Sequence, residues 1–350
     1  MKIALFDRIL ETHVVDALAD ALVALGHGVL ATGEVGRGHH PPATPAEIDA
    51  VDAAVARVRA SGCDALLNFR ASALLPRHLR ELREAGIATA VWLPDDPVLY
   101  GVAYRAVVDG YDHVLHCGPG AILRFYDARG HRPGISFPFW LDPVRWSADW
   151  DAGRAGSGLL FLGNLHGPAK RDRYAQLAPA AGRLVVYGKC GDDPARIHRG
   201  ELHGVDAIRS VLPLFAAGLN IPQRFRDYAG TAYDFAGLAD LGTFDLPSRV
   251  LQYAAAGLPV VTLGEAAPSP HFPATLVAAD IGMAMQAVDE LRAEPGRAEA
   301  LSARARADVV RYFSAHARAR CLAALFGGAL VPAGMDATAR EHAYREFAGA

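Results

Sequence analysis

Cysteine is scarce in this sequence and shows no pattern. The four cysteines are Cys63, Cys117, Cys190 and Cys321, and no two of them form a C-x-x-C pair. Disulfide frameworks and structural zinc sites need closely patterned cysteines, so the sequence predicts neither. We expect these side chains to behave as small buried apolar groups.

Long apolar runs and an excess of charge of one sign are also missing. No apolar stretch reaches the roughly 20 residues that cross a bilayer, and the N-terminal MKIALFDRIL lacks the apolar core of a signal peptide. Lysine and arginine together number 35 and aspartate and glutamate 38, which gives a net charge of −3. This near balance gives no electrostatic reason to expect a nucleic-acid partner. We therefore expect a cytoplasmic protein without a transmembrane segment.

A dinucleotide-binding loop is absent from the two places where it would be expected. No G-x-G-x-x-G follows the apolar run that ends at Phe6 or the run that ends at Leu162. Dehydrogenases with doubly wound domains use that loop to hold the pyrophosphate of their cofactor. The sequence therefore argues against a nicotinamide-dependent dehydrogenase.

The alternation of short apolar runs with helical patterns predicts two α/β domains. A length of 350 residues suits two domains of roughly 150 residues each. Continuous apolar strands separated by helices are typical of doubly wound parallel sheets that are covered on both faces. The predicted strands are Lys2–Phe6, Val29–Ala31, Ala65–Asn68, Ala88–Leu93, His113–His116 and Ile135–Phe137, then Leu159–Leu162, Leu184–Tyr187, Gly218–Ile221, Pro259–Leu263 and Thr275–Ala278.

A stretch rich in tryptophan, proline and glycine separates the two halves, from Phe137 to Gly158. We place the N-terminal domain at residues 1–145, the interdomain linker at 146–157 and the C-terminal domain at 158–320. A last long helix is predicted from about Ala298 to Arg320. Residues 321–350 are expected to form a helical segment that could pack back on the N-terminal domain.

The segment FLGNLHGPAKRDR, after the first strand of the second half, predicts an anion site. Gly163 and Asn164 follow the strand, and Lys170 and Arg171 open the next helix. A glycine lets a phosphate approach the backbone, and a helix N-terminus offers free N–H groups and a positive dipole end. Lysine is confined to three positions of the chain, which makes Lys170 more notable. A diphosphate is the natural ligand, and the alternative is a solvated basic helix start.

A second anion-binding feature is predicted in SRVLQYAAAGLPVVT, residues 248–262. Asp245 can cap this helix, Arg249 lies in its first turn, and Gly257 ends it. The helix follows an LNIP turn that begins at Leu219 and includes Asn220. The alternative is a structural helix–strand unit with a surface arginine.

These segments resemble those of a known family. SRVLQYAAAGLPVVT is similar to the R-x-x-E-x-x-A-x-G-x-P-V-V segment of GT-B glycosyltransferases, and the second half more narrowly resembles the CgeB-like, spore-maturation-protein-like family. In the same order along the chain, VWLPDDP, FPFWLDPVRW, GNLHGPAKR, LVVYGK, AGLNIP and HARARCLAAL resemble further segments of that family. The resemblance covers nearly the whole chain, and the shared order carries it more than any single segment.

The resemblance implies a GT-B fold, with two Rossmann-like doubly wound domains facing a central cleft. A nucleotide-diphosphate-sugar donor would bind the C-terminal domain and an acceptor the N-terminal domain. The residues carried over for the donor are Gly163, Asn164, Lys170, Arg171 and Arg249 around the diphosphate, Gly188 near the base, Asn220 in the L-N-I turn and Gln252 at the ribose.

Gln252 departs from the family pattern, in which a glutamate accepts hydrogen bonds from both ribose hydroxyls. Glutamine can accept from one hydroxyl and donate to the other, so contact survives. The lost charge-assisted bond would weaken donor binding by about 1 kcal/mol. The upstream acid of the family's E-x7-E pattern falls at Phe244, which cannot replace it, although Asp245 is adjacent. These departures leave open an inactive relative.

Candidates for the acceptor side lie in the first half. Asp95 and Asp96 follow a predicted strand and could supply a general base, or they could form a capped turn before a proline. His13 begins the first helix and could also act as the base, although a lone histidine is often structural. His39 and His40 are adjacent, but they have no third ligand nearby and do not predict a metal site.

The sequence thus predicts a metal-independent glycosyltransferase of hexosyl or N-acetylhexosaminyl type, with no cofactor beyond its NDP-sugar co-substrate. A UDP-sugar is favoured, and the acceptor is a small molecule or an envelope component of a bacterial or natural-product pathway. Fixed cations and helix dipoles can stabilise the leaving diphosphate without a metal. The alternatives are a sugar-nucleotide epimerase or hydrolase of the same fold and a non-catalytic nucleotide-sugar-binding homologue.

Overall fold

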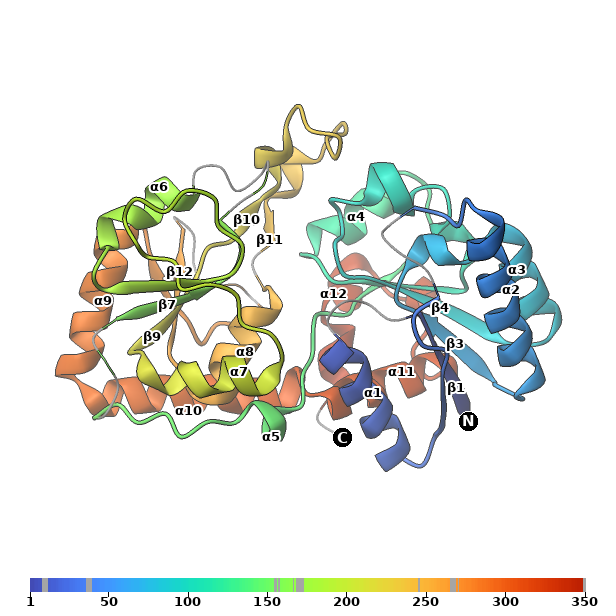
Figure 1. Ribbon diagram of the computed structural model, residues 1–350. Helices are drawn as coiled ribbons and strands as arrows, with labels where there is room; N and C mark the ends of the chain where they lie inside the picture. Colours follow the sequence, from blue (N-terminus) through green and yellow to red (C-terminus); the bar gives the residue numbers. More distant parts are fainter. Residues whose placement is uncertain are drawn as a thin grey trace. The chain divides into compact units, whose positions relative to one another are not determined.

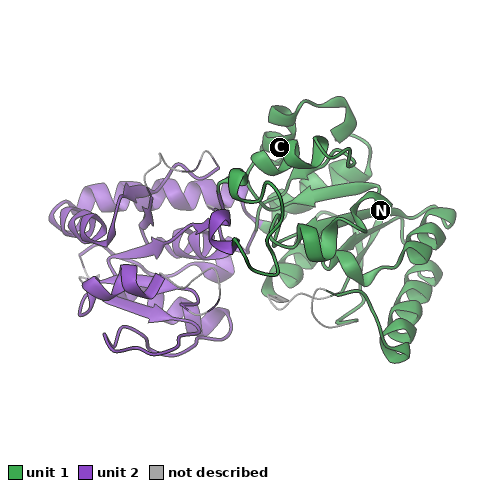
Figure 2. Cartoon of the chain, turned by 90° about the horizontal axis from the view of Figure 1, so that it is seen from above, with its two compact units in different colours: residues 1–139, 229–242, 315–350 green, residues 140–228, 243–314 purple. Residues whose placement is uncertain are grey.

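The chain divides into two units, which are described separately. The computed structural model describes residues 1–7, 12–35, 40–153, 156, 158–165, 167, 173–244, 246–264, 269 and 271–348. Unit 1 holds Met1–Phe139, Ala229–Gly242 and Ala315–Ala350, and unit 2 holds Trp140–Tyr228 and Thr243–Ser314 (Figure 2). We call Ala229–Gly242 the arm, because it belongs to unit 1 although unit 2 segments precede and follow it in the sequence.

Unit 1 is built on a six-stranded parallel sheet with the order β2-β1-β3-β4-β5-β6. Its strands are β1 (Lys2–Phe6), β2 (Gly28–Ala31), β3 (Ala65–Asn68), β4 (Ala88–Leu93), β5 (His113–His116) and β6 (Ile135–Ser136). The chain moves from β1 to β2 on one side and then returns to β3 on the other side. Right-handed crossovers therefore place the following helices on opposite faces, and the order reverses between β1 and β3.

The helices of unit 1 cover both faces of this sheet (Figure 1). They are α1 (Thr12–Ala24), α2 (Pro45–Ala60), α3 (Pro76–Glu84), α4 (Ala121–Asp127), α11 (Ala315–Phe326) and α12 (Ala337–Glu346). α1 packs against α11, α2 packs against α3, and α12 packs against β6 and α4. Thr44 caps α2, because its side chain accepts a hydrogen bond from the Glu47 N–H and the Glu47 side chain accepts one from the Thr44 N–H.

Unit 2 is built on a five-stranded parallel sheet with the order β13-β12-β9-β7-β8. Its strands are β7 (Leu159–Leu162), β8 (Leu184–Tyr187), β9 (Ala217–Asn220), β12 (Val260–Leu263) and β13 (Leu276–Ala278). A separate antiparallel pair, β10 (Gln223–Arg224) and β11 (Thr243–Phe244), brackets the segment that contains the arm. In the five-stranded sheet, the strand order reverses between β7 and β9.

The helices of unit 2 complete its core. They are α5 (Pro143–Trp146), α6 (Arg173–Leu177), α7 (Val205–Val211), α8 (Ser248–Ala256), α9 (Ile281–Ala293) and α10 (Pro295–Tyr312). One apolar cluster joins the buried strand residues to α6 and α9, for example Phe161 to Leu177 and Val288. Helix α8 packs between β9, β12 and α10, and this packing sets where its first turn lies.

The predicted last long helix is wrong, because the structure has two helices there. Helix α10 ends at Tyr312 and α11 begins at Ala315. At the break the Leu141 N–H donates to the Phe313 carbonyl (3.1 Å), and Leu141 forms a β-bridge with Ser314. The chain also leaves unit 2 for unit 1 at this point. The sequence has neither glycine nor proline here, and the helix ends where the chain pairs with Leu141.

Candidate functional site

The polar residues predicted in the second half gather at the carboxyl ends of the unit 2 strands. Gly163 and Asn164 follow β7, Gly188 follows β8, and Asn220 is the last residue of β9. These strands are parallel neighbours, so their ends meet at one edge of the sheet. That edge, at the reversal between β7 and β9, is where open α/β sheets bind ligands.

The loops after β7 and β8 touch backbone to backbone. Gly188 has φ of 144°, and a Cβ added there would lie 2.5 Å from the carbonyl oxygen of Gly163. Only glycine permits this approach. The Asn164 Oδ1 accepts a hydrogen bond from the Lys189 N–H (2.9 Å), which fixes the two loops together. The predicted roles of these residues in binding a nucleotide remain predictions.

Arg249 lies in the first turn of α8 and reaches the same edge. Its guanidinium stands over the Phe161 ring, 5.2 Å from the centroid, and its Nη2 donates to the Ile221 carbonyl (2.9 Å). Its Nε is buried and has no hydrogen-bond partner among the described residues. A buried N–H without a partner costs free energy, so this atom is suited to receive a ligand oxygen.

A second arginine, which sequence reasoning missed, stands beside the first. Arg173 begins α6, is 6% exposed, and donates to the carbonyls of Ile221 and Asn164 (both 3.4 Å). Its guanidinium is 5.9 Å from the Phe161 centroid. Two guanidinium groups therefore share one carbonyl oxygen and one aromatic ring. The available signal was its position, two residues after the predicted Lys170–Arg171 pair.

Asp227 is a described carboxylate whose charge acts on Arg173 of this arginine pair, but it forms its ion pair with Arg224 (2.9 Å). Neither Arg173 nor Arg249 forms an ion pair with a described carboxylate. Removal from solvent, followed by the nearby charge of Arg173, lowers the pKa of Arg249 to about 10. Burial also lowers the pKa of Arg173. An anion with several oxygens would relieve both effects, so the pair favours a phosphate-like ligand.

Gln252 lies one helical turn after Arg249, which places the two on the same side of α8. It is 7% exposed, and its side chain makes no hydrogen bond to another described residue. The next residue, Tyr253, fixes the helix in place, because its hydroxyl accepts a hydrogen bond from the Leu162 N–H (2.7 Å) and its ring fills the space beside Gly218. Gln252 therefore sits on a rigid helix with its polar atoms available.

Several predicted residues cannot be placed. Lys170, Arg171, Asp245 and His39 lie outside the described residues. Phe244 is described, and it ends β11, where it pairs with Gln223.

Asn220 is buried at the end of β9. Its Nδ2 faces the hydroxyl of Thr262 on the neighbouring strand β12 (3.4 Å). This contact joins two strands and gives Asn220 a structural role. Its role in donor binding stays a prediction.

The adjacent carboxylates of unit 1 occupy different environments. Asp96 is buried, and its Oδ2 lies 2.6 Å from the Nδ1 of His116 while its Oδ1 accepts a hydrogen bond from the Tyr126 hydroxyl (2.9 Å). Asp95 is exposed at the carboxyl end of β4. Asp96 is therefore a buried residue with internal hydrogen-bond partners, whereas the exposed Asp95 is the carboxylate that an acceptor could reach.

His13 is half-buried in the first turn of α1, which follows β1. Asp95 follows β4, so both candidate bases lie after strands of one parallel sheet, with β3 between β1 and β4. Their function as bases stays a prediction.

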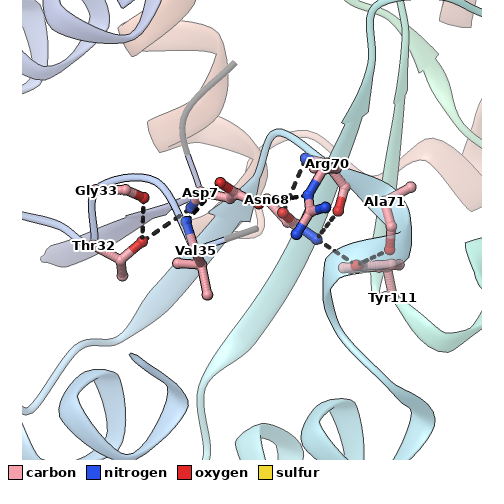
Figure 3. A network of polar contacts seen from close by, with 8 residues as sticks. All are labelled: Asp7, Thr32, Gly33, Val35, Asn68, Arg70, Ala71 and Tyr111. Atoms are coloured by element: carbon pink, nitrogen blue, oxygen red, sulfur yellow. Dashed lines mark hydrogen bonds and ion pairs between the residues drawn. The ribbon is translucent and has the colours of Figure 1, made fainter. Parts of the chain in front are cut away.

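A polar network that sequence reasoning missed lies at the reversal between β1 and β3 (Figure 3). The Asp7 Oδ2 lies 2.6 Å from the Nε of Arg70, and its Oδ1 accepts a hydrogen bond from the Val35 N–H (3.1 Å). Asn68 donates to the Tyr111 hydroxyl (2.6 Å) and accepts from the Arg70 N–H (3.0 Å). Asp7 also has φ of 62°, which is unusual for a residue other than glycine. Polar residues directly after two apolar runs were the available signal.

No three histidine, cysteine, aspartate or glutamate side chains of the described ranges form a group that could hold a metal ion. Within those ranges, no helix is long and apolar enough to pass through a lipid bilayer.

Comparisons with known proteins agree with this architecture. Residues 164–324 match a family model described as "Glycosyl transferase-like". No curated protein matches the sequence of the chain. The family match covers the half of the chain that holds the arginine pair.

Three solved structures are similar over most of the chain. AviGT4, a glycosyltransferase involved in Avilamycin A biosynthesis, is 19% identical with a TM-score of 0.59, over 96% of this chain and 99% of that one. Anabaena Alr3699/HepE in complex with UDP-glucose is 11% identical with a TM-score of 0.61, over 94% and 100%. An α-glucosyltransferase in complex with UDP and a 13-mer DNA containing a HMU base is 13% identical with a TM-score of 0.56, over 90% and 96%.

These similarities confirm the predicted fold class. The two parallel sheets with their covering helices form the α/β GT-B fold of glycosyltransferases. The identities are low, so they establish the fold and leave the donor, the acceptor and the CgeB-like assignment to other arguments.

Proposed function

We propose that this protein is a metal-independent glycosyltransferase that moves a sugar from a nucleotide-diphosphate sugar to an acceptor. The donor would bind unit 2, and the acceptor would bind unit 1. The observation that carries the proposal is the arginine pair Arg173 and Arg249, two guanidinium groups without a described carboxylate partner at the ligand-binding edge of the second sheet.

The arginine pair would act on the leaving group. When the acceptor oxygen attacks C1 of the sugar, the bond from C1 to the diphosphate oxygen breaks and its electron pair leaves with the diphosphate. Guanidinium groups fixed by Ile221 and Phe161 stabilise that growing negative charge without moving. The described residues thus supply a cationic site of the kind that a leaving diphosphate needs, and Lys170 and Arg171 would add to it.

The acceptor proton needs a base if the reaction inverts the anomeric carbon. Asp95 is the first candidate, because it is exposed after β4 while Asp96 is committed to His116. His13 is the second. If the reaction retains configuration, the leaving diphosphate can take the proton on the same face, and neither residue is required.

The finer assignments rest on the similar structures and on the sequence resemblance. A UDP-sugar is favoured because two of the similar structures hold UDP or UDP-glucose, and the transferred sugar would be a hexose or an N-acetylhexosamine. The CgeB-like relationship and an acceptor that is a small molecule or an envelope component follow from the sequence resemblance alone. A cytoplasmic location likewise remains the sequence-based proposal.

A second candidate is a protein that binds a nucleotide sugar without transferring it. The observation that favours it is Gln252, which replaces the family's ribose-binding glutamate one turn from Arg249. Because that glutamate binds and does not attack, we rank this candidate below the transferase.

The test begins with thermal shifts of the full chain in UDP, GDP, TDP and their common sugars, with magnesium or with EDTA. A ligand at 100 times its Kd stabilises the folded state by about 2.7 kcal/mol. A shift with one nucleotide that is equal in EDTA supports the donor site and its independence of metal, and no shift with any nucleotide refutes the site.

Turnover of the binding sugar nucleotide then separates the classes. Consumption that requires an acceptor supports the transferase, and consumption of the donor alone indicates a hydrolase or epimerase. Binding without turnover across an acceptor panel supports the non-catalytic homologue. The panel should include DNA, because one similar structure is a complex with a 13-mer DNA and the near-neutral net charge does not exclude a DNA acceptor.

A further inference from the structure

Unit 1 contains a pocket that the proposed function does not use. It has a volume of about 440 Å³, which suits a small ligand. Its walls come from the π-helical turn Tyr100–Tyr104 and the residue after it, from the segment after α4, and from the arm. The lining residues are Tyr100, Arg105, Arg129, His131, Phe235 and Ala236.

Aromatic rings form one part of this pocket and hold each other in place. The Tyr100 and Phe235 rings lie 5.2 Å apart between centroids, at 54°. Phe125 packs behind both, 4.8 Å from Tyr100 and 5.5 Å from Phe235. The Tyr100 hydroxyl is hydrogen-bonded to the His131 Nε2 (2.8 Å). These contacts fix the rings before any ligand arrives, which lowers the entropy cost of binding.

Positive charge forms the other part. The guanidinium of Arg129 lies 3.5 Å from the Phe125 centroid and donates to the Ala236 carbonyl of the arm (2.9 Å). Arg105 is exposed at the end of the π-helical turn. Neither arginine forms an ion pair with a described carboxylate. Asp109 lies near the pocket, where its carboxylate is hydrogen-bonded to His131 Nδ1 (2.8 Å) and to the Arg132 N–H (3.0 Å) rather than paired with either arginine.

From this combination we propose that the pocket binds a small aromatic carboxylate. The carboxylate would lie between the guanidinium groups of Arg105 and Arg129, and the ring would lie against Phe235 and Tyr100. An inorganic anion would use the arginines and leave the rings without a partner, while a neutral aromatic compound would do the reverse. The inference rests on the pocket alone and does not depend on the proposed transferase activity.

Calorimetric titration of the full chain tests this site directly, without a sugar nucleotide. The probe is 4-hydroxybenzoate, and the comparison ligands are 4-hydroxybenzyl alcohol, which lacks the charge, and acetate, which lacks the ring. We expect saturable binding of the probe and about tenfold weaker binding of each comparison ligand. Equal binding of acetate would reduce the site to a general anion site and overturn the proposal, and so would the absence of probe binding.

Substitutions then locate the bound probe. Arg105→Ala should weaken binding about fivefold, because it removes one exposed charged contact. Arg124→Ala is the matched control, since Arg124 is an exposed arginine on α4 that does not line the pocket. Phe235→Ala should weaken binding without reducing its dependence on salt. If Arg105→Ala and Arg124→Ala bind the probe equally well, the probe binds elsewhere and the proposal fails.

The same titration distinguishes this proposal from the proposed function. A variant such as Arg249→Met, altered only in unit 2, should bind the probe as tightly as the unaltered protein. Probe binding in a protein that shows no nucleotide shift would support the pocket while refuting the donor site.

Discussion

Replacing Arg249 with methionine should remove nucleotide binding without destabilising the ligand-free protein. The arginine carries a charge into a partly buried position, beside a second cation and without a described carboxylate partner. Methionine keeps much of the apolar stem against Phe161 and removes the charge. If the arginine pair exists to bind a ligand, the free protein gives up stability to keep it.

The expected change in folding stability of Arg249→Met is the sum of opposing contributions. Lowering the pKa of Arg249 from 12.5 to about 10 corresponds to at most about 3–4 kcal/mol. Because the side chain keeps some exposure, we discount this to about 1–2 kcal/mol. The variant loses a cation–π contact with Phe161 of about 0.5–1 kcal/mol. The Ile221 carbonyl keeps its contact with Arg173, so it is not left without a donor. The net change is a stabilisation of zero to about 1 kcal/mol.

Differential scanning fluorimetry with and without the nucleotide that binds best measures both effects. We expect a melting temperature unchanged or raised by up to about 3 °C, together with loss of the nucleotide-dependent shift. Arg304→Met, at an exposed position on α10, is the control and should leave both quantities unchanged. A variant that melts several degrees lower yet still responds to nucleotide would refute the reasoning, because Arg249 would then be a structural residue.

Three further outcomes are expected. Asp95→Asn should leave the melting temperature within about 1 °C and should reduce turnover if the enzyme inverts; full turnover in this variant would remove Asp95 as the base. Asp96→Asn should instead destabilise the fold by about 2 kcal/mol, because it weakens the buried contact with His116. Gln252→Glu should tighten donor binding about fivefold by restoring a charge-assisted bond to the ribose, and calorimetry showing equal or weaker binding would count against a ribose contact there. Burial lowers the pKa of His113 below 6.5, so near and below that pH the folded state binds fewer protons than the unfolded state and loses stability as the pH falls. The melting temperature of His113→Gln minus that of the unaltered protein should therefore increase as the pH is lowered from about 7.5 to about 5. A difference that stays constant over this range would contradict the prediction.

The strands could be predicted from the sequence because their signals are local, whereas the GT-B fold class was implied by the resemblance of several segments that follow one another in the family's order. Each strand is a short apolar run between helical patterns, and the predicted bounds of β1, β3, β7 and β8 agree with the structure. The capping box at Thr44 is also encoded within four residues. The end of α10 could not be predicted, because it depends on pairing with Leu141, which lies far away in the sequence.

The candidate site was predicted only where a motif marks it. Arg249 lies inside a recognisable segment and was found, whereas Arg173 has no motif and gains its place from sharing the Ile221 carbonyl and the Phe161 ring. Asp95 and Asp96 look equivalent in the sequence. Only the folded sheet shows that Asp96 turns inward to His116 while Asp95 stays exposed. Such differences come from tertiary contacts, which local pattern does not record.

Which charged side chains have an ion-pair partner, and which have none, indicates where this protein binds ligands. The chain has more carboxylates than lysines and arginines, so a shortage of acidic partners cannot explain an unpaired arginine. Buried acids of unit 1 are tied to internal partners, as Asp7 is to Arg70. By contrast, no described carboxylate forms an ion pair with the arginine pair of unit 2, although pairing would relieve the cost of its burial; the nearby Asp227 is paired with Arg224 instead. A cation kept unpaired at a ligand-binding edge is explained most directly by an anion that arrives from outside, which is why the donor site and the stability of the free protein should respond in opposite directions when that cation is removed.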